Sequence, residues 1–184
     1  MFRIPVDKSL DLALLEVRHA STLFALVEEN REHLRRYLPW VDATRTVNDS
    51  IAYINATLEQ FARSQSVNVG IFTQGMLAGI CGYHVIDWAN RRTALGYWLA
   101  ASFQGRGLMT RSVRALTAHG FSSLGLHRLE IRAALENKRS RQVAERAGYR
   151  FEGICRGAEW LHERYVDHAV YGLLSTDWTP SLLT

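Results

Sequence analysis

A strand-like apolar run, a turn with two glycines and a helical pattern follow one another between residues 94 and 124. The run is Ala94–Leu99, the turn contains Gly105 and Gly107, and the helical pattern begins near Leu108. The first turn of a helix leaves about four backbone N–H groups without partners and carries a partial positive charge. Glycines have no Cβ atom to hold a phosphate at a distance from the main chain. The segment therefore predicts a site for a pyrophosphate.

Apolar periodicity indicates a mixed chain of strands and helices on both sides of this segment. Thr46 begins one helix with Asp49 in the capping-box position, Gln74-Gly75 is typical of a hairpin turn, and Asn137 is typical of a helix N-cap. We expect strands near residues 10–17, 67–71, 77–86, 92–100, 129–133, 150–160 and 165–174, and helices near 23–38, 46–61, 108–124 and 137–147.

The expected order is β-α-α-β-β-β-α-β-α-β-β. It predicts an α/β (mixed α+β) fold with a central mixed, mostly antiparallel sheet of about seven strands and helices on both faces. The order excludes a Rossmann repeat and a helical bundle. We find no linker or internal repeat, so residues 1–184 are expected to form a single domain.

Composition narrows the function classes. The formal net charge is +4, which is typical of a solvated basic surface, with attraction to an anionic partner as the alternative. No nucleic-acid-binding motif accompanies the charge, so we expect no direct nucleic-acid binding. Cys81 and Cys155 lie in apolar segments without Cys or His at metal-ligand spacing, which predicts buried free thiols and no metal site. No apolar run approaches the ~20 residues that span a bilayer, so we expect a cytoplasmic protein without a membrane partner.

Residues 104–110 are compatible with several phosphate loops. A Walker A loop needs a Lys after the glycines, and this chain has none there. A dinucleotide-binding loop needs a third glycine near the first βαβ unit, whereas Gly105 and Gly107 lie in mid-chain. An acyl-coenzyme A loop of the form Q/R-x-x-G-x-G/A is matched by Gln104 and Gly107, although Met109 departs from it. A tight turn without a ligand is the remaining interpretation.

The segments around this loop favour the acyl-coenzyme A interpretation. Those that carry a family resemblance are Leu34–Trp40, Gly96–Leu99, Gln104–Thr110, Glu136–Ala144, Gly148–Gly153, Ala158–Leu161 and Tyr165–Asp167 with Tyr171. With these segments the chain resembles the GNAT superfamily of N-acetyltransferases. Within it, the chain is similar to the branch that acetylates the N-terminal serine or alanine of ribosomal proteins.

The resemblance implies acetyl-coenzyme A as cosubstrate. The backbone of Tyr97, Trp98 and Leu99 would bind the pantetheine arm, with an N–H near Leu99 as the oxyanion donor. The pyrophosphate would lie on the amides of the loop, and Asn137 would contact the cofactor. The loop residues are Gln104, Gly105, Arg106, Gly107, Leu108, Met109 and Thr110. Met109 would contribute its amide, which requires that its side chain point away from the phosphates.

The resemblance also implies the catalytic residues. Glu159 would be the general base, acting through a water, and Ser140 would give a proton to the departing sulfur. A solvent-facing strand carboxylate and a helix cap are the ordinary structural alternatives for these two residues. Tyr37, Trp40 and Trp88 would wall the acceptor site, although core packing is the commoner role of aromatic side chains. Apart from the resemblance, His168 on the last strand is the histidine of most interest, although a surface or core role is the commoner one for the histidines of this chain.

The expected function is transfer of an acetyl group to an amine, most readily an N-terminal α-amine of an acidic ribosomal protein. Acetylation of a small-molecule amine or antibiotic, and coenzyme A binding without catalysis, are the alternatives. Members of this branch are often dimers, so a homodimer is a further expectation from the resemblance.

Overall fold

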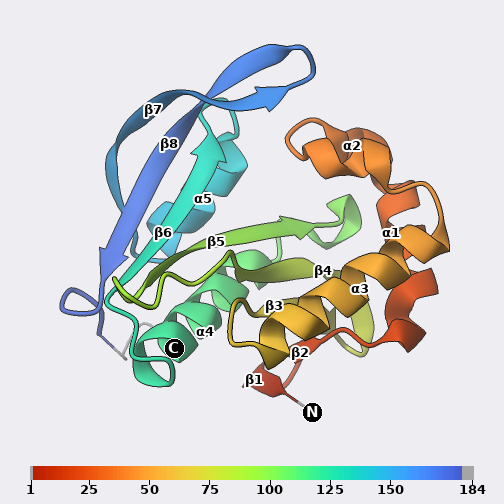
Figure 1. Cartoon of the computed structure of the whole chain (residues 1–184), viewed down its shortest axis with the longest axis horizontal. Coiled ribbons are helices and arrows are strands. Elements are labelled where there is room, and N and C mark those ends of the chain that lie inside the picture. The colour runs from red at the N-terminus through yellow and green to blue at the C-terminus, as the bar shows by residue number, and fades with distance from the viewer. Residues whose placement is uncertain (1, 180–184) are drawn as a thin grey trace. The chain divides into compact units, whose positions relative to one another are not determined.

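The computed structural model describes residues 2–179 of the chain. Within these residues the chain forms two compact units: residues 2–82 with Tyr97–Leu108, and Tyr83–Gly96 with residues 109–179. Figure 1 labels the helices and strands of the chain. Each unit is described by itself. The strand β5 (Arg92–Leu99) contributes residues to both.

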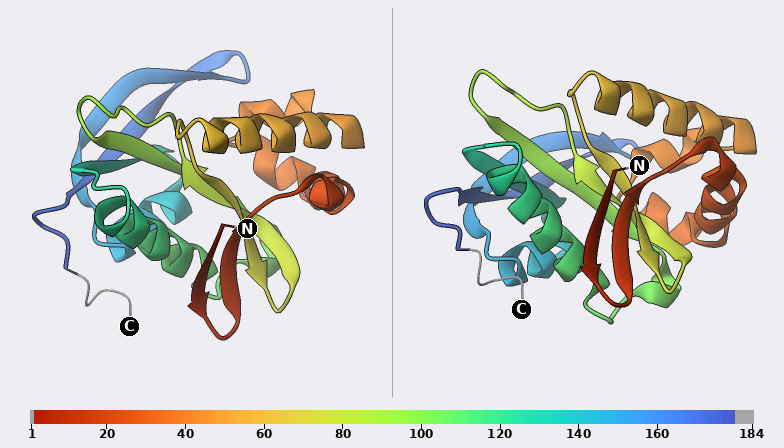
Figure 2. Two further views of the ribbon diagram at one scale, coloured as in Figure 1. Left: turned by 60° about the horizontal axis from the view of Figure 1, so that its bottom comes forward. Right: turned by 90° about the horizontal axis from the view of Figure 1, so that it is seen from below.

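The first unit contains an antiparallel run of four strands. They are β1 (Arg3–Asp7), β2 (Leu10–Leu14), β3 (Asn68–Thr73) and β4 (Met76–Tyr83), each paired with the next. The β3–β4 turn has positive φ at both Gln74 and Gly75, which confirms the predicted hairpin turn. Figure 2 shows the β1–β2 hairpin in dark red at one edge of the unit.

Helices α1 (Ala20–Glu29) and α3 (Val47–Ala62) pack together in the first unit. Thr46 and Asp49 form the predicted capping box at the start of α3. The helix expected over residues 23–38 is broken: after α1 come a short α2 (Arg31–Arg35) and a 3-10 turn, η2 (Pro39–Ala43). The break lies at Asn30, whose φ of −115° and ψ of 12° are not helical.

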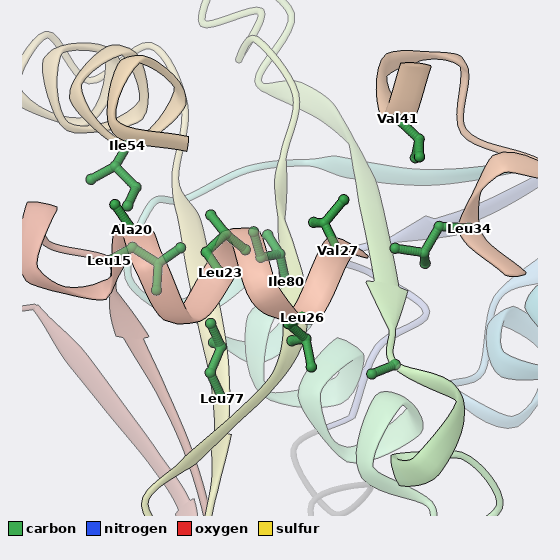
Figure 3. Close-up of a cluster of buried hydrophobic side chains, with 11 residues drawn as sticks. Leu15, Ala20, Leu23, Leu26, Val27, Leu34, Val41, Ile54, Leu77 and Ile80 are labelled. Carbon is green, nitrogen blue, oxygen red and sulfur yellow. The ribbon is translucent and has the colours of Figure 1, made fainter. Parts of the chain in front are cut away.

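The core of the first unit lies between these helices and the strand β4 (Figure 3). Leu23 and Val27 of α1, Ile54 of α3 and Leu77 and Ile80 of β4 are among its buried side chains. Leu23 and Val27 are four residues apart, about one turn of helix, so both point to the same side of α1. Leu77 and Ile80 are three residues apart on β4, where a bulge next to Leu77 shifts the alternation of the strand. Burial of these apolar groups is the main force that holds the helices on this face.

The second unit joins β5 to β6 (Arg128–Ala134), β8 (Arg164–Leu174) and β7 (Arg150–Leu161). The β5–β6 pairing is parallel, which requires a crossover, and α4 (Leu108–Ser122) supplies it. The other two pairings are antiparallel. A short helix, α5 (Lys138–Arg146), contacts β6, β7 and β8.

The strand order of the described chain is β1-β2-β3-β4-β5-β6-β8-β7. The mixed, mostly antiparallel sheet is therefore confirmed, with eight strands in place of about seven. The additional strand is β1, none of whose residues is buried. It contains Pro5, which removes one ladder donor and is tolerated on an edge strand. An edge strand without a buried face carries no alternation signal in its sequence, so it escaped prediction.

Candidate active site

The loop before α4 contains two glycines whose conformation is unusual. Gly105 and Gly107 have φ values of 76° and 70°, in the left-handed region that side chains other than glycine rarely adopt. Both are exposed, and a Cβ atom at either position would meet no other group within 4 Å. The glycines are therefore required by the path of the main chain, and the space in front of them is open. These two properties fit a bound pyrophosphate.

The residues after the glycines turn their side chains inward. Leu108 and Met109 are buried, with only 7% of Met109 exposed. The backbone N–H of Met109 therefore belongs to the first turn of α4, while its thioether lies in the protein interior. The side chain of Arg106 folds back on the loop, where it donates to the carbonyl oxygen of Ser102 at 3.0 Å and lies over the ring of Phe103.

Two contacts of the first unit hold the segment between β5 and the glycines, and neither was predicted from the sequence. The Nε2 atom of Gln104 lies 2.7 Å from Nε2 of His33, on α2. The buried carboxamide of Asn30 accepts from the backbone N–H of Ala101 and donates to the carbonyl oxygen of Leu26, each at 2.8 Å. Helical periodicity gave no signal for either contact, because each joins residues 71 positions apart.

The end of β5 lies very close to β4. A Cβ atom on Gly79 would lie only 2.2 Å from the carbonyl oxygen of Trp98, so this approach depends on glycine. Ala100 continues the pairing by donating its N–H to Ala78 at 2.9 Å. The parallel ladder with β6 runs from Arg92 to Leu95, so Tyr97, Trp98 and Leu99 come after it.

Two of the predicted binding residues meet in the first unit. The rings of Trp40 and Trp98 lie with their centroids 6.0 Å apart at 46°. Arg35 donates to both carboxylate oxygens of Asp42, at 2.7 and 3.0 Å, which ties α2 to η2. This contact holds the segment that carries Tyr37, half-buried, and Trp40, 38% exposed. Trp88 belongs to the second unit, in the turn before β5.

In the second unit, the predicted N-cap of α5 is confirmed. The side-chain oxygen of Asn137 accepts from the backbone N–H of Ser140 at 3.1 Å. Ser140 therefore lies in the first turn of α5, three residues after the cap. Asn137 comes three residues after Ala134, the last residue of β6, which is paired with His168 of β8.

A β-bulge determines where Glu159 points. Cys155 is paired with His168 and Glu159 with Val166, so four steps along β7 match two along β8. Gly157 adopts a φ of 58° within the bulge and donates its N–H to the Asp167 carboxylate at 2.8 Å. Bulges of this kind re-aim side chains and are common beside active sites.

Beyond the bulge, Glu159 meets a histidine. Its Oε2 lies 3.2 Å from Nε2 of His168, and the two side chains are 31% and 17% exposed. Glu159 is thus neither fully solvated nor buried, and it has a titratable neighbour. The structure brings Glu159, His168, Asn137 and Ser140 to the same end of β6 in the second unit.

The cysteine prediction is half wrong. Cys81 is buried, and burial raises the pKa of its thiol far above the ordinary value, but Cys155 is exposed. The physical reason is that β7 lies at the end of the sheet order and exposes most of its residues, so its apolar sequence does not mean burial. Residues 2–179 contain no helix long and apolar enough to cross a bilayer, and no group of three metal-ligating side chains.

A mixed, mostly antiparallel sheet with a glycine turn before a crossover helix is compatible with an acyl-coenzyme A-dependent transferase. The sequence comparison agrees: residues 10–150 match the family described as Acetyltransferase (GNAT) domain. The chain belongs to this family and is an acetyl-coenzyme A-dependent N-acetyltransferase.

Individual relatives are similar over nearly the whole chain. A ribosomal-protein-serine acetyltransferase of Escherichia coli (strain K12) is 30% identical, covering 91% of this chain and 94% of that protein. The solved structure of RimL, a ribosomal L7/L12 alpha-N-protein acetyltransferase, in complex with coenzyme A has a TM-score of 0.91 at 29% identity, covering 94% and 98% of the two chains. The microcin C7 self-immunity acetyltransferase MccE, in complex with acetyl-coenzyme A and AMP, has a TM-score of 0.89 at 26% identity, covering 93% and 95%.

Proposed function

We propose that this enzyme acetylates the N-terminal α-amine of a ribosomal protein. The observation that carries the choice of acceptor is the similarity, over 91% of the chain, to a ribosomal-protein-serine acetyltransferase. The net charge of +4 would favour an acidic acceptor by electrostatic attraction. Since ribosomal proteins are made and assembled in the cytoplasm of bacteria, the enzyme would act there.

The cosubstrate would be held mainly by backbone groups. The amides from Gln104 to Thr110 would bind the pyrophosphate, with the positive charge of Arg106 or Arg111 available to it. The backbone of Tyr97–Leu99, beyond the part of β5 that is paired with β6, would bind the pantetheine arm. Asn137 would contact the cofactor while it caps α5. The glycine conformations and the buried side chains of Leu108 and Met109 support this assignment.

The transfer needs three groups from the chain. Glu159 would accept a proton from the acceptor amine through a water as the C–N bond forms. The backbone N–H of Leu99 would stabilise the negative charge that develops on the carbonyl oxygen. As the C–S bond breaks, Ser140 would donate a proton to the sulfur, which leaves as the free thiol of coenzyme A. Tyr37, Trp40 and Trp88 would wall the acceptor.

A carboxylate base suits an α-amine better than a lysine. With reference pKa values near 7.8 and 10.4, roughly a quarter of α-amines but only about 0.1% of lysine side chains are neutral at pH 7.4. A glutamate that acts through water can remove the remaining proton in the first case. The lysine case would need a stronger base or an acceptor whose pKa is lowered on binding.

A second candidate function is acetylation of a small-molecule amine. It is favoured by the similarity to the microcin C7 self-immunity acetyltransferase, whose structure contains AMP. A panel of acceptors separates the two candidates. Release of free thiol is measured with N-terminal Ser and Ala peptides, with the same peptides blocked at the α-amine, and with polyamines, aminoglycosides and aminoacyl nucleotide analogues. Turnover confined to small amines would contradict the proposed function.

The role of Glu159 is tested with Glu159→Gln, which retains the shape of the side chain and removes the base. We expect kcat to fall about 10²-fold or more while the affinity for acetyl-coenzyme A, measured by calorimetry, stays unchanged. Glu163→Gln, in the exposed turn between β7 and β8, is the matched control and should leave kcat unchanged. Equal kcat values for Glu159→Gln and the wild type would exclude Glu159 as the base.

A further inference from the structure

We propose that His168 is a positioning residue for Glu159: its Nε2–H donates a hydrogen bond to Oε2 and fixes the orientation of the carboxylate. The inference rests on the proposed role of Glu159 as base. It adds a residue that acts through Glu159 without touching the acceptor or the cosubstrate. The contact itself is the 3.2 Å approach of the two side chains.

The two residues lie on strands of different rigidity. β8 is paired on both sides, with Ala134 of β6 and Cys155 of β7 opposite His168. β7 ends the sheet order, and most of its residues are exposed. A glutamate on such an edge strand has three rotatable side-chain bonds and little packing to restrict them. A histidine anchored in the interior of the sheet can supply that restriction.

The bulge in β7 makes the pair possible. Glu159 is opposite Val166, and His168 is two residues further along β8 on the same face. Diagonal neighbours of this kind lie within reach of long side chains. The bulge is held by Gly157, whose N–H donates to Asp167. The bulge thus determines which residue of β7 meets His168.

Other charged groups of β6, β7 and the start of β8 form ion pairs of their own. On β6, Glu130 binds both Arg128 and Arg132, and on β7, Glu152 binds Arg128. At the end of the β7–β8 hairpin, Arg164 lies 3.4 Å from Glu136. Within residues 2–179, His168 is the charged or titratable side chain that the structure places at hydrogen-bond distance from Glu159. The orientation of this carboxylate therefore depends on the imidazole.

A single hydrogen-bond donor suits a base that works through water. The hydrogen bond occupies one carboxylate oxygen, Oε2, and leaves Oε1 to accept from the water that removes the proton. A lysine or arginine in the same place would stabilise the charged carboxylate more strongly and weaken it as a base. An imidazole with a proton on Nε2 fixes the orientation of the carboxylate through one hydrogen bond.

The kinetic test compares two substitutions of similar size. His168→Phe removes the donor, and His168→Gln restores one at the end of a side chain of similar reach. We expect kcat to fall about tenfold in His168→Phe and to recover most of this loss in His168→Gln, with KM for acetyl-coenzyme A unchanged in both. In the Glu159→Gln background, His168→Phe should have no further effect, because the two residues act as one unit. His127→Phe, at an exposed histidine of the same unit, is the control.

The hydrogen bond itself is tested by NMR spectroscopy, which does not depend on catalytic turnover. Long-range ¹H–¹⁵N correlation spectra of the folded wild type at the assay pH should show His168 protonated at Nε2, and Glu159→Ala should abolish this preference. An Nε2 atom without a proton, or full activity of His168→Phe, would overturn the proposal. A wild-type protein that turns over no amine would instead contradict the proposed function, so the two failures are distinct.

Discussion

Asn30 joins two segments of the first unit with one side chain. It is 9% exposed, and its carboxamide accepts from Ala101 and donates to Leu26. A buried carboxamide whose oxygen and nitrogen both form hydrogen bonds is costly to remove, because each backbone group bonded to it loses its partner. The residue also ends α1, so the same carboxamide sets the direction of α2 and the position of the turn before the phosphate loop.

Asn30→Ala should lower the free energy of unfolding by about 1–3 kcal/mol, since the N–H of Ala101 loses its acceptor. Urea denaturation of both proteins measures the change. Glu29→Ala, at the exposed neighbouring position, is the control and should change the stability by less than ~0.5 kcal/mol. Equal effects of the two substitutions would contradict the structural role of Asn30.

At the scale of elements, the phosphate loop and the β3–β4 hairpin offer a matched pair of glycines. Gly107 and Gly75 have φ values of 70° and 77°, and a Cβ atom on either would meet no group within 4 Å. Alanine at either position therefore costs the same kind of backbone strain, about 1 kcal/mol. Only Gly107 belongs to the proposed pyrophosphate site.

We expect Gly107→Ala to weaken the binding of coenzyme A about tenfold, a change of ~1.4 kcal/mol, because its methyl group lies where the phosphate approaches. Gly75→Ala should lose a similar amount of stability and leave this affinity unchanged. Calorimetric titration and urea denaturation of both variants give the two quantities. Loss of affinity in Gly75→Ala as well would show that strain alone explains the effect.

The capping box of α3 predicts a pH dependence. Asp49 accepts from the backbone N–H of Arg45 and from both the N–H and the hydroxyl of Thr46. The bond from Arg45, followed by those from Thr46, lowers the pKa of this carboxyl below its usual value of 3.8. A carboxyl whose pKa is lower in the folded state stabilises that state above its ordinary pKa, and this contribution is lost as the pH falls through the lowered value.

Asp49→Asn should therefore be less stable than the wild type at neutral pH, and the difference should shrink as the pH falls below about 4. The measurement is the free energy of unfolding in urea from pH 7 to pH 3. A difference that stays constant over this range would show that the carboxylate charge contributes nothing to the cap.

On the scale of the whole molecule, β5 is the element that the two units share. Arg92–Gly96 lies in the second unit and Tyr97–Leu99 in the first, within one continuous strand. Loss of either unit would break this strand. We therefore expect one cooperative unfolding transition, which is also what the single-domain prediction for residues 1–184 requires.

Tryptophan fluorescence can follow each unit separately. Trp40 and Trp98 lie in the first unit, and Trp88, Trp160 and Trp178 lie in the second. When the tryptophans of one unit are replaced by Phe, the fluorescence of the variant reports unfolding of the other unit alone. Circular dichroism of the same variant gives the unfolding midpoint of the whole chain. Within each variant the two midpoints in urea should coincide. Separate midpoints would mean that the chain consists of two domains.

Local chemistry allowed many features to be predicted from the sequence. The Thr46–Asp49 capping box, the Gln74-Gly75 turn and the Asn137 cap depend on residues within a few positions of one another. The alternation of Leu129, Ile131 and Ala133 likewise marked the buried face of β6, because side chains alternate between faces along a strand. The phosphate loop was predicted from the order of strand, glycine turn and helix, whereas Glu159 was found through family resemblance, and the roles of both stay predictions.

The sequence by itself thus determined caps, turns, strand faces and the family, since each follows from short-range spacing or from a motif. Only the tertiary structure decided that Asn30 breaks a helix, that Cys155 is exposed and that Glu159 meets His168. These facts depend on which strand lies at an edge and on the register across a bulge. Register and burial are properties of the packed chain, and no local pattern carries them.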